Sequence, residues 1–143
     1  MKSIAIYCGS SDQISEKYLS AARNIGKTIA ERGIQVVYGA GSTGMMGAVA
    51  NAALEAGGEV FGIIPKIFDT PQLAHAGLTR YEVVPDMHTR KAMMIDNSDA
   101  FIALPGGFGT FEEFFEVLTW AQIGIHSKPI GLLNTDGYFN TLL

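Results

Sequence analysis

The segment Ala100-Phe101-Ile102-Ala103-Leu104-Pro105-Gly106-Gly107-Phe108-Gly109-Thr110 decides the fold. An apolar run leads into a glycine-rich turn, and helical spacing of apolar residues then begins at Thr110 and continues to about Ile123. A strand that is apolar at every position is buried on both faces, which is typical of a parallel sheet covered by helices. This segment therefore predicts a strand, a tight turn and a helix within an α/β protein.

The rest of the chain repeats this alternation of short apolar runs and helical patterns. We expect strands at residues 3–8, 34–38, 60–64, 81–84, 100–104 and 129–133, and helices around residues 18–29, after the second strand, at 87–97 and at 110–123. Residues 66–80 lack a clear period and are expected to form a mobile loop with one short helical turn. The order predicts a doubly wound, Rossmann-like parallel sheet with helices on both faces, as one domain over residues 1–143.

Composition excludes several classes of function. The 143 residues carry a net charge of −4, and the Lys and Arg residues are scattered rather than clustered, which argues against a nucleic-acid partner. No apolar window is long enough to span a membrane. Cys8 is the single cysteine, and no His, Asp or Glu spacing indicates a metal site. We expect a cytoplasmic protein that needs no metal.

Three glycine-bearing turns follow predicted strands, at residues 8–11, 39–47 and 105–110, and should meet at one edge of the sheet. The middle turn contains Gly41, Ser42 and Gly44 in a G-x-G-x-x-G pattern. The strand after it ends without the carboxylate that a dinucleotide site requires, and Met45 replaces the lysine of a P-loop. Its glycines either contribute to a phosphate site or serve only close packing of helix and sheet.

The turn at 105–110 gives the stronger indication of a phosphate site. Gly106, Gly107 and Gly109 carry no side chains, so backbone N–H groups can face an anion there. Thr110 can add its hydroxyl group and is expected to cap the following helix. The dipole of this helix also favours a negative charge at its start.

Two charged elements lie near this turn. Phe111, Phe114, Phe115 and Leu118 are expected to form the buried stripe of the helix, with the glutamates on its other faces. Glu113 is one turn from the proposed phosphate and within reach of a ribose that this phosphate holds. Arg90 and Lys91 follow the capping residue Asp86 near a helix start, where the dipole disfavours cations, and a local rule broken in this way points to function.

These segments together resemble the "lonely guy" (LOG) family of cytokinin riboside 5′-monophosphate phosphoribohydrolases over almost the whole chain. The family signature P-G-G-x-G-T-x-x-E is matched without a gap by residues 105–113. Residues 8–11 match C-G-S-S, residues 41–47 match G-S-x-G-x-M-G, and residues 87–91 match M-H-x-R-K. Family members usually continue for several tens of residues past the segment at 137–140, and form a last helical part there.

The resemblance implies hydrolysis of the N-glycosidic bond of an N6-substituted adenosine 5′-monophosphate, with Glu113 and Arg90 as the catalytic residues. It implies substrate or phosphate contacts from Ser10, Gly41, Ser42, Gly44, Met87, Lys91, Gly106, Gly107, Gly109 and Thr110. It also implies a homodimer and no cofactor. The alternatives are a non-catalytic nucleotide-binding or carrier protein, and a glycosidase with another base preference. A lysine decarboxylase activity does not fit, because no constellation for pyridoxal phosphate is found.

Overall fold

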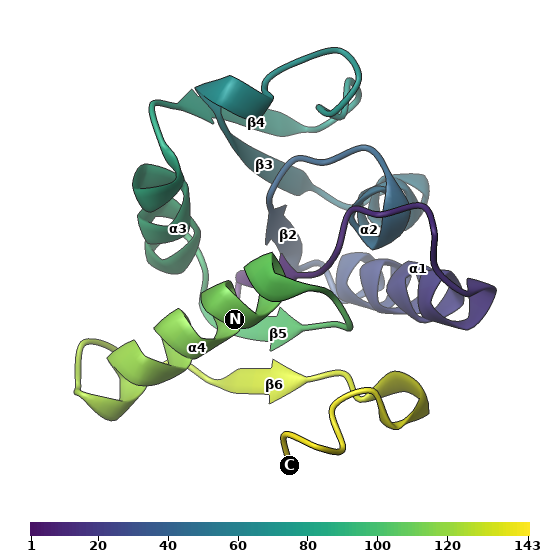
Figure 1. Ribbon diagram of the computed structural model, residues 1–143. Helices are drawn as coiled ribbons and strands as arrows, with labels where there is room; N and C mark the ends of the chain where they lie inside the picture. The colour runs from purple at the N-terminus through teal and green to yellow at the C-terminus, as the bar shows by residue number, and fades with distance from the viewer.

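The computed structural model describes residues 1–143, in which strands and helices alternate along the chain (Figure 1). The strands are β1 (Ser3–Tyr7), β2 (Gln35–Tyr38), β3 (Val60–Pro65), β4 (Arg80–Val84), β5 (Ala100–Ala103) and β6 (Ile130–Leu132). The helices are α1 (Glu16–Glu31), α2 (Gly44–Glu55), α3 (Met87–Asp96) and α4 (Phe108–Gln122), with short 3-10 turns η1 (Lys66–Phe68) and η2 (Thr135–Gly137). The predicted order of elements is confirmed.

All six strands form one sheet in the order β4-β3-β2-β1-β5-β6, and every neighbouring pair is parallel. From β1 the chain builds the sheet outward through β2, β3 and β4, and then returns to place β5 on the other side of β1. The strand order therefore reverses between β1 and β5. At such a switch point the two following connections leave toward opposite faces of the sheet, and a crevice opens between them.

Helices cover both faces of the sheet (Figure 1). On one face, apolar residues of α1 and α2 such as Ile29 and Val49 pack with the sheet residue Tyr38. On the other face, Met94 of α3 and Val117 of α4 belong to a separate core cluster. The doubly wound architecture predicted from the apolar strands is thus confirmed. None of the helices combines the length and the apolar composition needed to cross a bilayer.

The buried stripe predicted for α4 is wrong in its rotation. Phe115 and Leu118 are 44% and 42% exposed, while Thr110, Glu113 and Val117 are buried with Phe114. Both stripes have helical spacing and share Phe114, but they differ by a rotation of one residue. Counting apolar residues favours the wrong rotation, because the sheet-facing side of this helix includes a threonine and a glutamate. The correction places Glu113 inside the protein.

Residues 66–80 were predicted as a loop with one short helical turn, and they contain the 3-10 turn η1 and end at Arg80, where β4 begins. The loop returns to the connection between β2 and α2, where the Ser42 N–H donates to the Leu73 carbonyl and the His75 N–H donates to the Ala40 carbonyl. These bonds fix the loop against the second glycine-rich turn. Ala40 itself adopts a left-handed backbone conformation, with φ of 63°.

Candidate active site

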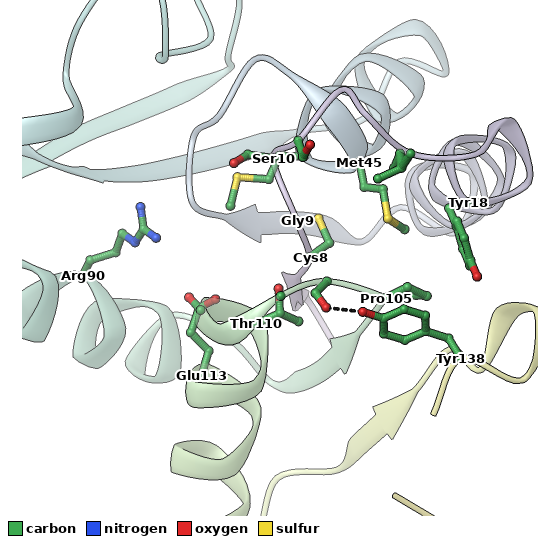
Figure 2. A pocket seen from close by; sticks show the side chains of 16 residues that line it. Cys8, Gly9, Ser10, Tyr18, Met45, Arg90, Pro105, Thr110, Glu113 and Tyr138 are labelled. Carbon is green, nitrogen blue, oxygen red and sulfur yellow. Dashed lines mark hydrogen bonds between the residues drawn. The ribbon is translucent and has the colours of Figure 1, made fainter. Parts of the chain in front are cut away.

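A cavity of about 530 Å³ lies at the switch point, between the ends of β1 and β5 (Figure 2). Its lining comes mainly from the first and third glycine-bearing turns, with further residues in or near α1, at the start of α2, in α3 and in the C-terminal segment. The turn after β1 contributes Cys8, Gly9, Ser10 and Ser11; the turn after β5 and the start of α4 contribute Pro105, Gly106, Gly107, Gly109, Thr110 and Glu113; Ile14, Tyr18, Met45, Met46, Arg90 and Tyr138 complete it. The cavity brings together seven of the predicted site residues: Ser10, Arg90, Gly106, Gly107, Gly109, Thr110 and Glu113.

The start of α4 offers the cavity a row of free hydrogen-bond donors. The backbone N–H groups of residues 106–110 donate to no group of the protein, and the first donor along this stretch with a partner is the Phe111 N–H, bonded to the Gly107 carbonyl. The N-cap residue is Gly107, which has no side chain to satisfy them. Unpaired N–H groups at a helix start form an anion-binding concavity, since the helix dipole adds to their partial charges.

The glycines of this turn serve different purposes. A Cβ atom on Gly106 would lie 2.2 Å from Thr110 Oγ1, so this position must be glycine for the turn to close over Thr110. A Cβ atom on Gly107 or Gly109 would meet no atom within 4 Å. The fold does not require glycine at these two positions, and their missing side chains keep the mouth of the donor row open.

The capping role expected for Thr110 is wrong. The helix begins at Phe108, two residues earlier than predicted, and Gly107 occupies the N-cap position. Thr110 is only 4% exposed and packs beneath Gly106 in the first turn of α4. The error arises because a threonine after glycines matches the usual cap pattern, whereas here the glycine-rich segment itself enters the helix.

Tyr138 supports the same turn from the C-terminal segment of the chain. Its hydroxyl group donates a hydrogen bond to the Gly106 carbonyl, as the dashed line in Figure 2 shows. Its ring meets Tyr18 of α1 edge to face, with 5.8 Å between ring centroids. Because a trans peptide directs its C=O and N–H oppositely, this bond also fixes the direction of the Gly107 N–H. Sequence reasoning missed Tyr138, since no local pattern links it to a turn so far along the chain.

Glu113 projects from α4 toward the cavity and is 7% exposed (Figure 2). Burial raises the pKa of its carboxyl group to about 7, and the nearby positive charge of Arg90 only partly opposes this shift. Glu112 and Glu116 raise the pKa further, while Lys91 lowers it. A carboxyl group with this pKa exchanges a proton readily near neutral pH, which suits acid–base catalysis.

Arg90 reaches the cavity from α3, on the side opposite the turn after β5 (Figure 2). Arg90 is 7% exposed, and its guanidinium donates one long hydrogen bond, 3.4 Å from Nη1 to the Gly39 carbonyl oxygen. Its Nε is buried without a partner. Burial lowers the pKa of Arg90 and the charge of Glu113 raises it again, yet the two groups form no ion pair within 4.0 Å. A substrate placed between them can therefore meet both groups.

In the middle glycine-rich turn, Gly41, Ser42 and Gly44 lie outside the cavity lining. Gly44 has φ of +59°, and a Cβ atom there would lie 2.5 Å from the Ser11 carbonyl oxygen. The same construction at Gly47 gives 2.2 Å to the Ser42 carbonyl oxygen. Close packing, the alternative that the sequence left open, explains these two glycines. The residues between them, Met45 and Met46, do line the cavity; Met46 is the methionine of the G-S-x-G-x-M-G motif, whereas no motif singled out Met45.

Met87 and Lys91 also lie outside the cavity lining. Lys91 instead forms ion pairs with two glutamates of α4, 3.1 Å from Nζ to Glu112 Oε1 and 3.1 Å to Glu116 Oε2. A pyridoxal phosphate site needs a lysine that can form a Schiff base in the cavity, and no lysine is among the lining residues, so this cofactor does not fit. The structure gathers no group of three or more His, Cys, Asp or Glu side chains able to hold a metal ion.

A doubly wound sheet with a cavity at its switch point, beside an uncapped helix start, defines a Rossmann-like protein built to bind a small anionic ligand. Comparison with known families identifies it further. Residues 46–143 match the family model described as "Possible lysine decarboxylase". The chain belongs to this family, and within it to the LOG group that its motifs resemble.

Curated relatives match almost the whole chain. A cytokinin riboside 5′-monophosphate phosphoribohydrolase of Rhodococcoides fascians is 51% identical over 99% of this chain and 72% of its own length. One of Arabidopsis thaliana is 51% identical over 98% of this chain and 65% of its own length. A relative from Oryza sativa subsp. japonica, named as a probable enzyme of this kind, is 51% identical over 99% and 67%. The chain thus spans about two thirds of the length of these relatives.

Solved structures share the fold at lower identity. The molybdenum cofactor carrier protein of Chlamydomonas reinhardtii is 24% identical, with a TM-score of 0.75 over 99% of this chain and 83% of its own. The molybdenum cofactor binding protein of Rippkaea orientalis is 23% identical, with a TM-score of 0.76 over the same shares. At this identity the likeness concerns the fold alone.

Proposed function

We propose that this protein hydrolyses the N-glycosidic bond of N6-substituted adenosine 5′-monophosphates, and releases the free cytokinin or adenine base and ribose 5-phosphate. One observation carries the proposal: a buried carboxyl group with a pKa of about 7, that of Glu113, stands one helical turn from the free N–H groups of residues 106–110. The names of relatives that are about half identical in sequence support the same reaction.

The residues of the cavity have separate roles in this reaction. The 5′-phosphate accepts hydrogen bonds from the N–H groups of Gly107, Gly109 and their neighbours, and this places the ribose near Glu113. As the bond from C1′ to the base nitrogen breaks, both of its electrons go to the base, and positive charge develops on the ribose. The Glu113 carboxylate stabilises that charge and accepts a proton from water, whose oxygen forms the new bond to C1′.

Arg90 acts through its charge in this proposal. A guanidinium group does not readily lose its proton, so it is a poor general acid. Its unpaired Nε and weakly bonded Nη1 can hydrogen-bond to the departing base, which takes a proton at a ring nitrogen from solvent water as it leaves, while the proton that Glu113 accepts from the attacking water passes on to solvent. The fixed positive charge also favours the ionised form of Glu113, the form that the attacking water needs.

The proposal includes a homodimer that acts in the cytoplasm without a cofactor. Support for the dimer comes from α4, where Phe108 is 97% exposed and Phe115 and Leu118 are each more than 40% exposed. Apolar side chains gathered on one helix are typical of a surface that a protein contact covers. Cys8, the only cysteine, is free and buried, which is compatible with a reducing compartment.

Incubation with N6-isopentenyladenosine 5′-monophosphate and with AMP, followed by chromatography of the products, tests the reaction directly. We expect the wild-type protein to release the free base, and Glu113→Ala to lose at least about 100-fold in rate. If neither substrate is cleaved, the hydrolase proposal is wrong, and tight AMP binding without turnover would instead indicate a carrier. A panel of other nucleoside monophosphates distinguishes a different base preference.

A further inference from the structure

The middle glycine-rich turn begins with a backbone group that bonds to a proposed catalytic residue. The carbonyl oxygen of Gly39, the residue directly after β2, accepts a hydrogen bond from Arg90 Nη1 at 3.4 Å. Arg90 forms no ion pair, and its Nε has no partner, so this carbonyl is the one protein group to which the guanidinium bonds. The position of the carbonyl therefore decides where the guanidinium of Arg90 points.

Gly39 also provides the surface on which the guanidinium lies. A Cβ atom at this position would be 3.3 Å from Arg90 Cζ, 3.3 Å from Arg90 Nη1 and 3.2 Å from Met46 Cε. These separations are tighter than ordinary van der Waals contact, so a side chain at Gly39 would push the guanidinium away from the carbonyl. Glycine at this position lets the backbone and the guanidinium approach closely enough to bond.

The turn behind this carbonyl is strained and is held by hydrogen bonds on two sides. Ala40 has φ of 63°, a left-handed conformation that is unfavourable for alanine and persists only where the surroundings impose it. This angle orients the peptide group that contains the Gly39 carbonyl. From the loop after η1, the His75 N–H donates to the Ala40 carbonyl at 2.9 Å. From the core, the Tyr38 hydroxyl group donates to the Gly41 carbonyl at 2.8 Å.

We propose that Tyr38 is a positioning residue, whose hydroxyl group holds the turn at residues 39–41 so that the Gly39 carbonyl directs the Arg90 guanidinium into the cavity. The proposal rests on the proposed function, because it concerns the group that would act on the departing base. Tyr38 is fully buried and does not line the cavity, so it acts through Arg90 and not by contact with the substrate.

The hydroxyl group of Tyr38, rather than its ring, has this role. The ring packs in the core cluster beneath α1 and α2, where a phenylalanine ring would fill the same space. Only the hydroxyl group reaches the turn, and it closes a link from the last residue of β2 to a residue three positions later. Burial raises the pKa of this hydroxyl group, so Tyr38 remains a neutral hydrogen-bond donor near pH 7.

The variant Tyr38→Phe removes the hydroxyl group and keeps the ring. The pKa of Glu113 is measured by carbon-13 NMR without substrate, and kcat and KM are measured with N6-isopentenyladenosine 5′-monophosphate. The charge of Arg90 lowers the pKa of Glu113, so a guanidinium that is held less firmly should lower it less. We expect Tyr38→Phe to raise this pKa by about half a unit, and to lower kcat about tenfold with KM within about threefold.

Two further proteins separate positioning from lost stability. Val36→Ala weakens the same strand and the same core cluster without touching the turn, so it should leave both kcat and the pKa of Glu113 near wild type. In an Arg90→Ala background, Tyr38→Phe should change kcat less than about twofold and leave the pKa of Glu113 unchanged, because the group through which Tyr38 acts has been removed.

Three results would overturn the proposal: unchanged kcat and pKa in Tyr38→Phe, equal changes in Val36→Ala, or the full effect of Tyr38→Phe in the Arg90→Ala background. If wild type shows no turnover, the proposed function fails, while the pKa of Glu113 in the same proteins still decides the role of Tyr38. If Tyr38→Phe does not fold, Gly39→Ala decides it. That change displaces the guanidinium from the carbonyl directly, so a raised pKa of Glu113 supports the proposal and a wild-type pKa overturns it.

Discussion

Two helices of this protein begin directly after glycine-rich turns, and their first turns are satisfied in opposite ways. At the start of α2, the Gly44 N–H donates to Asp12 Oδ1 at 2.8 Å, and the Met46 N–H donates to the Gly9 carbonyl at 3.1 Å. At the start of α4, the N–H groups of residues 106–110 have no protein partner. The first helix start is closed by the protein itself, and the second is left open to the cavity.

The difference shows what a glycine-rich turn can and cannot indicate. The turn at 39–47 contains four glycines and the turn at 105–110 contains three, so both are rich in glycine. At Gly44 and Gly47 a side chain would collide with backbone atoms, whereas at Gly107 and Gly109 it would meet nothing within 4 Å. Glycine that packing requires says little about ligands. A glycine that packing does not require indicates that the space beside it is kept free for a ligand.

The largest effect is expected from a substitution near the start of α2, the helix start that the protein itself closes. Gly47→Ala places a Cβ atom 2.2 Å from the Ser42 carbonyl oxygen, so backbone must shift, and we expect a loss of more than about 3 kcal/mol in the free energy of unfolding. Gly109→Ala is the matched control in the open helix start, where we expect a change within about 1 kcal/mol. Chemical denaturation measures both. Equal destabilisation by the two changes would contradict the comparison.

A second prediction concerns the carboxyl group next to the open helix start. The pKa of Glu113, about 7, lies above its ordinary value of 4.5, so the folded protein retains a proton there that the unfolded chain has lost. Its contribution to stability is therefore fully present below about pH 4.5, declines as the pH rises, and is lost above about pH 7. We expect Glu113→Gln to be more stable than wild type above pH 7, by on the order of 3 kcal/mol.

Thermal or chemical unfolding of this variant from pH 4 to pH 9 measures the effect. The gain should disappear at the acid end, where the wild-type carboxyl group is itself neutral. A stability difference that does not depend on pH would show that Glu113 is not desolvated as the structure describes. Greater stability together with lost turnover is the usual combination for a group that is buried for function.

The smallest effect is expected from removing the side chain that accepts a hydrogen bond from the start of α2. Asp12→Ala removes the carboxylate that accepts a hydrogen bond from the Gly44 N–H, and we expect a loss of about 1 kcal/mol in unfolding free energy. The sign is opposite to that of Glu113→Gln, because the exposed Asp12 carboxylate stabilises its helix while the buried Glu113 carboxylate is costly. Urea denaturation at pH 8 compares the two. The comparison would fail if Asp12→Ala were also stabilising.

The sequence predicted the fold well because the central strands are apolar at nearly every position. Runs such as residues 100–104 identify buried parallel strands, and alternation with helical patterns then fixes the doubly wound class. The capping of α3 was also predicted, and the structure confirms it with a bond of 2.7 Å from the Thr89 N–H to Asp86 Oδ1. These features depend on local periodicity and local hydrogen bonding, which sequence reasoning can follow.

Parts of the candidate site depend on features that local patterns do not contain. The rotation of α4 was wrong because a buried glutamate is indistinguishable from an exposed one in sequence. Lys91 was grouped with Arg90 because the two are adjacent, although successive helical residues point in different directions. Tyr138 approaches Gly106 only through the tertiary fold. The positions of such residues can be determined only from the folded structure.

The reversal of strand order between β1 and β5 also has a consequence for folding. Ile4 of β1 pairs with Val36 on one side and with Ala100 on the other. The pairing with β2 closes a short loop of chain, while the pairing with β5 closes a much longer one and is entropically the costlier step. We therefore expect the strands β1 to β4 to assemble before β5 joins them. The reactive centre, which needs both strand ends, would then be among the last parts of the molecule to form during synthesis.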